Sequence, residues 1–207
     1  MSSFLPVFAM VGIFTASVVC LAADRGNLIP NPGFEEVAEG ADPSALPKGM
    51  QASSDEKEQQ VVFFSLAADQ KASGERSLCI RRTDKKGNAR VTIATIPVQP
   101  GGRYYLSCEV KSTEGRPSLL LDLQNKDRKN VAEPLIDAVN LSLGGTLAHG
   151  GRMISLPWAT SEHPDRFNKL EAVFTIPSDI HFLVLRTNYS WITGTAWYDD
   201  FALYSLD

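Results

Sequence analysis

Short runs in which apolar and polar residues alternate dominate the chain from Asn27 onward. A period of two places successive side chains on opposite faces of a strand, so these runs predict half-buried β-strands. In one run, Tyr104, Leu106, Cys108 and Val110 all fall on the same face. The predicted strands are Val61–Leu66, Ser77–Arg82, Arg90–Val98, Arg103–Ser112, Ser118–Gln124, Lys169–Ile176, His181–Thr187 and Thr195–Ser205.

Turn residues separate these runs, as at Pro100-Gly101-Gly102 and Pro177-Ser178-Asp179. Such residues end strands because they allow positive φ or remove a hydrogen-bond donor. The best helical candidate, Glu133 to Val139, is too short to be stable alone. Many short strands without a strand–helix rhythm predict an all-β sandwich or barrel of one domain. The segment from Asn125 to Pro157 has no recognisable pattern of apolar and polar residues.

The N-terminus carries an apolar segment, from Phe4 to Ala23, that ends in small residues. This layout predicts a secretory signal peptide over residues 1–22, cleaved after Ala22 or Ala23. The alternative is an uncleaved anchor, because about 20 apolar residues are enough to span a membrane. Either interpretation places the folded part outside the cytoplasm, secreted or in the cell envelope. After cleavage we expect no association with a membrane.

Charge and cysteine content exclude several classes of protein. A formal net charge of −4 and a pI near 5.4 argue against a nucleic-acid-binding protein. Three cysteines are too few for a disulfide scaffold or a zinc cluster. The strand pattern places Cys79 and Cys108 on opposite faces, so we expect both to remain free thiols.

Motifs for catalysis are missing from the sequence. There is no Gly-x-Ser-x-Gly, no His-Glu-x-x-His and no phosphate-binding loop. Glu35 with Glu36, and Asp199 with Asp200, are adjacent carboxylates, whereas a glycosidase needs two carboxylates that face each other across a cleft. The sequence therefore predicts that the protein is not an enzyme.

Five motifs occur in a specific order along the chain. They are NLIPNPGFEE (Asn27–Glu36), SGERSLCI (Ser73–Ile80), VQPGGRYYLSCEVK (Val98–Lys111), LEAVFTIP (Leu170–Pro177) and GTAWYDDFALY (Gly194–Tyr204). This order resembles the CenC-like carbohydrate-binding modules, the four/nine group of the galactose-binding-like jelly rolls. The resemblance implies a jelly roll of two antiparallel sheets over residues 23–207, with Phe34 as a plug in its core.

The resemblance also implies a metal site. In that family, the positions that match Glu35 and Asp199 commonly hold a structural calcium ion together with backbone carbonyls. Calcium prefers six to eight oxygen ligands, so two carboxylates and several carbonyls suit it chemically. The alternative is that both side chains are solvated or hydrogen-bonded carboxylates at strand ends.

Aromatic side chains are the candidates for sugar binding, because pyranose rings pack against flat aromatic faces and polar neighbours then hold the hydroxyls. The candidates are Trp191, Tyr189 and Trp158, with Asn188 as a polar partner. Trp191 lies in a polar loop and is the first choice, although a Trp that packs into its loop is the commoner outcome.

A basic cluster surrounds one predicted hairpin and comprises Arg81, Arg82, Lys85, Lys86 and Arg90. It suits an acidic or sulfated polysaccharide, but a solvated turn with the same composition is more common. The sequence thus predicts a free-standing, non-catalytic module that binds a poly- or oligosaccharide. Two alternatives remain: a structural or adhesion sandwich of the cell envelope that makes protein contacts, and a small secreted enzyme with an unrecognised site.

Overall fold

The computed structural model describes residues 26–37, 40, 42, 44–54, 61–115, 117–131, 137–140, 145–146, 149–150, 153–155 and 165–207. The predicted signal peptide over residues 1–22 and the candidate Trp158 therefore lie outside the described residues. No helix in this part of the chain has the length and hydropathy needed to cross a membrane.

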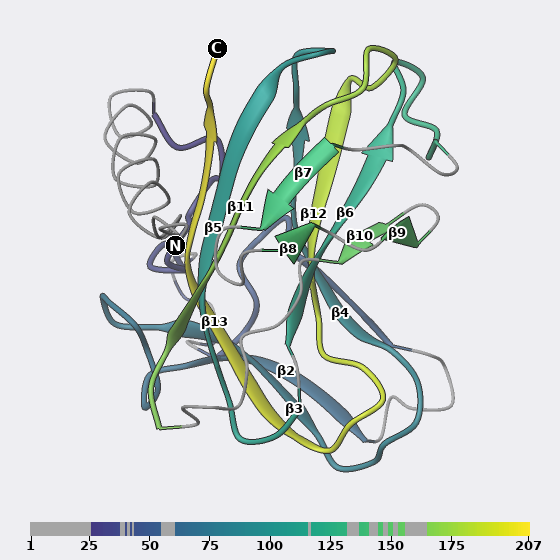
Figure 1. Cartoon of the computed structure of the whole chain (residues 1–207). Helices are drawn as coiled ribbons and strands as arrows, with labels where there is room; N and C mark the ends of the chain where they lie inside the picture. The colour runs from purple at the N-terminus through teal and green to yellow at the C-terminus, as the bar shows by residue number, and fades with distance from the viewer. Residues whose placement is uncertain are drawn as a thin grey trace, which may run out of the picture.

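The chain folds into two antiparallel sheets that face each other (Figure 1). The six-stranded sheet has the order β1 (Gln51–Ser54), β4 (Ala89–Pro97), β12 (Phe182–Asn188), β6 (Ser118–Gln124), β10 (Met153–Ser155) and β9 (His149–Gly150). The seven-stranded sheet has the order β2 (Val62–Ala67), β3 (Ser77–Arg82), β13 (Gly194–Ser205), β5 (Arg103–Ser112), β11 (Asn168–Thr175), β7 (Asp137–Asn140) and β8 (Gly145–Thr146). The predicted all-β sandwich of two antiparallel sheets is thus confirmed.

The core lies between the sheets and follows the alternation in the sequence. Tyr104, Leu106, Cys108 and Val110 of β5 are all buried, as predicted. On the opposite sheet, the inward positions of β6 are leucines. Each predicted strand is present with ends that agree to within one residue. Alternation therefore identified the strands that bury one face.

Five further strands, β1 and β7 to β10, were not predicted. They have two to four residues each, which is too short for a period of two to be recognised. Four of them come from the unreadable segment between Asn125 and Pro157. The described end of the helical candidate, from Asp137 onward, belongs to strand β7.

The N-terminal segment forms no strand over its described residues 26–37. It is held by side chains and by two backbone hydrogen bonds, from the Leu28 N–H to the Leu203 carbonyl (2.9 Å) and from the Phe201 N–H to the Pro32 carbonyl (3.0 Å). The Asn27 amide donates from Nδ2 to the Phe201 carbonyl (2.8 Å), and its Oδ1 accepts from the Leu203 N–H (3.0 Å). The Asn31 side chain binds both the N–H and the carbonyl of Glu36, each at 2.9 Å. These two asparagines close a loop and fix it against β13.

Phe34 projects from this loop into the core and is fully buried, as the resemblance implied. Its ring meets the Phe201 ring edge-to-face, with 5.7 Å between centroids and 87° between planes. The backbone of Phe34 has φ = +61°, a left-handed conformation that is unfavourable for a residue with a Cβ atom. The packing of its ring must compensate for this strain.

A β-bulge interrupts the pairing of β13 with β5 directly after Asp199, and Asp200 has φ = +47°. One extra residue in β13 reverses the alternation at this point. Asp199 therefore pairs with Glu109 on the outer side of the sheet, whereas Phe201 and Leu203 lie in the core. The alternation of the sequence alone predicts that Asp199 shares a face with these two residues, and the bulge makes this prediction wrong.

Cys79 and Cys108 are free thiols, as predicted. They lie on β3 and β5, and β13 runs between these two strands. Burial raises the pKa of the Cys79 thiol to about 11 and that of Cys108 well above its ordinary value. Both side chains are therefore unreactive near neutral pH.

Candidate functional site

Trp191 lies in the loop that joins β12 to β13, at the lower end of the sandwich in Figure 1. Its side chain is the most exposed large apolar group of the described residues, with 67% of its surface accessible. Its backbone has φ = +61°, where glycine or asparagine would be less strained. The loop thus holds a large aromatic ring in solvent, in a conformation that costs free energy.

Tyr189 does not lie beside that ring. It is fully buried, and its hydroxyl donates to the carbonyls of Glu114 (2.7 Å) and Thr193 (3.2 Å). Burial raises the pKa of this phenol well above its ordinary value. The prediction that Tyr189 stacks on a sugar is wrong, because its ring is part of the core and anchors the loop from below.

Asn188 is half-buried and its amide is used within the protein. Its Oδ1 accepts from Ser190 Oγ (2.7 Å) and Arg90 Nε (3.3 Å), and its Nδ2 donates to Ser118 Oγ (3.1 Å). These bonds join β12, β4 and β6 at the base of the loop. Asn188 therefore positions the Trp191 loop.

The segment 83–88 lies against the Trp191 loop. The Trp191 N–H donates to the Gly87 carbonyl (3.1 Å), and the Ala89 N–H donates to Ser190 Oγ (3.1 Å). This segment joins β3 of one sheet to β4 of the other. The prediction of a hairpin here is therefore wrong: the segment crosses between the sheets, as the Trp191 loop does.

Arg82 explains how the two loops are held together. It is buried, and its guanidinium donates to the carbonyls of Ile192 (3.0 Å), Asp84 (3.3 Å) and Lys86. One member of the predicted basic cluster is thus a structural tie. Lys85 and Lys86, in contrast, are exposed.

The carboxylates predicted to bind a metal lie elsewhere, around the turn that precedes β3. Asp199 is fully buried, and its Oδ2 accepts from the N–H groups of Ala72 (2.8 Å) and Ser73 (3.3 Å). Its Oδ1 accepts from the Asp200 N–H (2.8 Å). Desolvation outweighs these bonds and raises the pKa of Asp199 to about 6.

Glu35 holds the other side of the same turn. Its Oε1 accepts from the N–H groups of Glu75 (2.9 Å) and Arg76 (3.1 Å). Gly74 between them has φ = +57°, and a Cβ atom at this position would collide with the Glu35 carboxylate. Glu35 and Asp199 together fix the turn to the N-terminal loop and to β13.

These contacts bear on the calcium ion that the resemblance implied. A Cβ atom built on Gly33 would lie 3.6 Å from Asp200 Oδ1 and 3.7 Å from Asp199 Oδ1, so carboxylate oxygens do gather at this loop. In the described part of the chain, however, no group of three or more His, Cys, Asp or Glu side chains is arranged to hold a metal. In this arrangement, the carboxylates of Glu35 and Asp199 accept hydrogen bonds from backbone N–H groups. Calcium binding at these residues stays a prediction.

A cleft of about 600 Å³ lies next to Asp199 on the outer face of the seven-stranded sheet. Glu109 and Lys111 of β5 form its floor with Asp200, and the segments 69–72 and 165–167 form its walls. Lys111 Nζ bridges the walls, donating to Gln70 Oε1 (2.7 Å) and to the Asp165 carbonyl (3.1 Å). Burial raises the pKa of Glu109.

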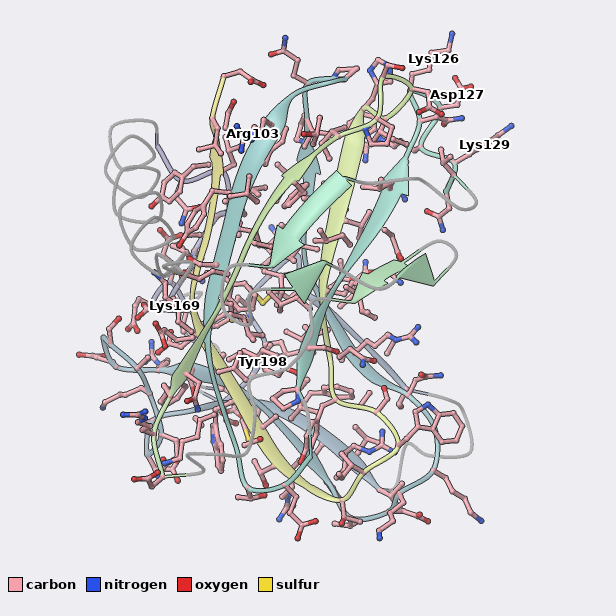
Figure 2. The ribbon with its side chains drawn as sticks, viewed as in Figure 1. Arg103, Lys126, Asp127, Lys129, Lys169 and Tyr198 are labelled. Atoms are coloured by element: carbon pink, nitrogen blue, oxygen red, sulfur yellow. The ribbon has the colours of Figure 1, made fainter. Side chains whose placement is uncertain are left out.

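Farther along the same face, the rings of Tyr105 and Tyr204 stack with 6.4 Å between centroids. The Tyr105 hydroxyl donates to Glu171 Oε1 (2.8 Å), which also lies 2.6 Å from Lys169 Nζ. Lys169 is labelled in Figure 2. Sequence reasoning missed this cleft and this cluster, because only strand pairing brings β5, β11 and β13 together.

Comparison with known proteins shows which of them share this fold. No protein-family model matches the sequence, and no curated protein matches it. Among solved structures, the enzymatically active domain of bacteriophage CBA120 tailspike protein 4 matches with a TM-score of 0.56 and 14% identity, over 87% of this chain and 21% of that one. An arabinose-bound MgGH51 α-L-arabinofuranosidase matches with a TM-score of 0.51 and 14% identity, over 87% of this chain and 26% of that one.

A family 16 carbohydrate-binding module also matches, with a TM-score of 0.49 and 14% identity, over 86% of this chain and 99% of that one. This chain therefore spans about a fifth and a quarter of the first two proteins. At such low identity the likeness shows a shared β-sandwich fold, and the function must be argued from the site.

Proposed function

We propose that the protein is a secreted, non-catalytic carbohydrate-binding module that holds a poly- or oligosaccharide on Trp191. The observation that carries the proposal is the exposed indole with a left-handed backbone. A non-glycine residue in this conformation costs about 1–2 kcal/mol, and an exposed ring gains little packing in return. The strained backbone at Trp191 thus brings no benefit to stability, which favours a role of this residue in binding.

The supports of the loop favour the same role. Tyr189, Asn188 and Arg82 hold the loop from the inside, so the indole is presented by a rigid backbone. A preorganised aromatic platform loses little entropy when a pyranose ring stacks on it. One open platform implies Kd values of about 1 μM to 1 mM. The order of the CenC-like motifs supports the same function.

Replacing Trp191 with glycine separates binding from stability. Glycine adopts φ = +61° without strain, so we expect the melting temperature of Trp191→Gly to equal or slightly exceed that of the wild type. We expect binding to be lost, because the stacking surface is gone. The measurement is a glycan-array screen of the wild type, followed by isothermal titration of the best oligosaccharide into both proteins.

Phe63→Ala is the matched control, since Phe63 is also an exposed aromatic, at 42% accessibility, but lies on β2. We expect it to bind as the wild type does. Unchanged binding by Trp191→Gly would exclude Trp191 as the platform. A wild type that binds no glycan would instead favour the alternative of a module that makes protein contacts.

A structural calcium ion at Glu35 and Asp199 is a separate proposal, supported by the resemblance and by the carboxylates that meet beside Gly33. An ion that binds only the native state, present at about 100 times its Kd, raises the free energy of unfolding by roughly 2.7 kcal/mol. We therefore expect added calcium to raise the melting temperature and a chelator to reverse the effect. Melting curves that respond to neither would remove the proposal.

A further inference from the structure

We infer that the ligand of the Trp191 loop is an acidic polysaccharide whose pyranose rings carry carboxylates, a polyuronate. The inference rests on the proposed function and specifies its ligand. It comes from the way the fold brings the basic segment between β3 and β4 against the exposed indole. The sequence placed these residues about a hundred positions apart.

The two loops form one unit at the lower end of the sandwich in Figure 1. The Trp191 N–H donates to the Gly87 carbonyl, and Lys86 directly precedes Gly87 in the chain. The Arg82 guanidinium binds the carbonyls of both Lys86 and Ile192, so it fixes the two loops on either side. Lys85 and Lys86 are therefore held next to the Trp191 loop by a buried tie.

The charge around the indole is positive, although the whole chain has a formal charge of −4. The cations of the segment 83–88 and of the strand ends beside it are Arg82, Lys85, Lys86 and Arg90, and the neighbouring anions are Asp84 and Glu114. The guanidinium of Arg81, on β3, instead lies over the Phe63 ring, 4.6 Å from its centroid. Asp84 Oδ1 accepts from the Lys86 N–H (3.2 Å). Neither Lys85 nor Lys86 forms an ion pair with another described residue. The two ammonium groups are available to a ligand.

The type of exposed cation, lysine and not arginine, favours a glycan with one carboxylate on each ring over a sulfated glycan. Arginine forks suit dense, multidentate oxyanions, but the forks of Arg82 and Arg90 are used by carbonyls and by the side chains of Asn88 and Asn188. In the segment 83–88, the cations that face solvent are two lysines, each a single point charge. A uronic acid carries its carboxylate on the ring itself, so one sugar unit can stack on the indole and reach an ammonium group.

The test compares acidic and neutral ligands on the full chain. We expect tetragalacturonate to quench the tryptophan fluorescence of the protein with a lower Kd than a neutral galactose tetramer. Raising NaCl from about 20 mM to about 300 mM should weaken the binding of the acidic tetramer but not that of the neutral one, because salt screens exposed charges. The double variant Lys85→Gln, Lys86→Gln should raise the Kd for tetragalacturonate by roughly three- to tenfold and leave the neutral ligand unchanged.

The double variant Lys126→Gln, Lys129→Gln is the matched control. These two exposed lysines lie at the opposite end of the molecule (Figure 2), and their removal changes the net charge by the same amount. We expect it to bind tetragalacturonate as the wild type does.

Each other outcome overturns the inference in a recognisable way. Equal Kd values for the acidic and neutral tetramers would refute the polyuronate and leave the carbohydrate-binding function intact. Preference for a heparin tetrasaccharide would assign the site to sulfated glycans. An effect of the Lys126, Lys129 control as large as that of Lys85, Lys86 would show attraction by net charge alone. Binding of none of the three ligands, with none found on a glycan array, would remove both the function and the inference.

Discussion

Asp199→Ala is expected to lower the free energy of unfolding by about 3 kcal/mol, because each hydrogen bond to a charged acceptor contributes about 1.5–3 kcal/mol. Three N–H groups lose this acceptor at once, those of Ala72, Ser73 and Asp200. The removal of a costly buried charge offsets part of this loss. The measurement is urea unfolding at pH 7 in the presence of a chelator, so that no metal contributes.

Asp200→Asn is the matched control. Asp200 is half-buried, and its Oδ1 accepts a single bond from Ser73 Oγ (2.7 Å) that an asparagine oxygen can also accept. Asparagine also tolerates φ = +47°. We expect a loss below about 1 kcal/mol. A similar effect of both variants would contradict the special role of Asp199.

The same residue makes stability depend on pH. Burial raises the pKa of Asp199 from 3.8 to about 6, so between these values the native state binds a proton that the unfolded state has released. Stability from this group is complete below pH 3.8 and is lost as the pH rises through about 6. A shift of two pKa units corresponds to about 3 kcal/mol. Asp199→Asn lacks this titration, so the stability of the wild type relative to Asp199→Asn should decrease from pH 4 to pH 6.

Other titrating groups cancel in that comparison. Glu109, whose pKa burial also raises, lies opposite Asp199 on β5 and is present in both proteins. Asp200 and Cys108 are likewise unchanged. A difference in stability that is constant with pH would show that Asp199 titrates near its ordinary pKa.

The strands could be predicted from the sequence because one face of each is buried. Along such a strand, residues point alternately into the core and into solvent, so the polarity of each residue shows which way it points. Leu78 and Ile80, both buried, illustrate this for β3. Strands of two to four residues carry too few positions for this signal. The bulge after Asp199 could not be predicted either, because the turn that binds this carboxylate lies 127 positions away in the sequence.

The candidate site was predicted only in part. The exposure of Trp191 followed from its polar neighbours, and the structure confirms it. The burial of Tyr189 did not follow, since its hydroxyl is satisfied by the Glu114 carbonyl, 75 positions away. The approach of Lys86 to the Trp191 loop likewise depends on Arg82, which looked like one more surface cation in the sequence. Long-range hydrogen bonds to backbone carbonyls leave no local pattern.

Phe34→Ala is expected to lower the free energy of unfolding by about 3–5 kcal/mol, the usual cost of removing a buried phenylalanine. The N-terminal loop has no strand over its described residues, so the ring of Phe34, the two asparagines and two backbone hydrogen bonds to β13 hold it. Near-ultraviolet circular dichroism should show the loss of the Phe34–Phe201 packing together with the lower stability.

Phe34→Gly separates the lost packing from backbone strain. At φ = +61° an alanine keeps the strain and a glycine relieves it, so Phe34→Gly should be more stable than Phe34→Ala by about 1 kcal/mol. Phe201 is the matched control, because it is the other ring of the same pair and lies in β13 without a positive φ. There glycine should be less stable than alanine, since glycine weakens a strand. The opposite order at Phe34 would mean that its backbone relaxes when the ring is removed, and that the ring itself imposes the left-handed conformation.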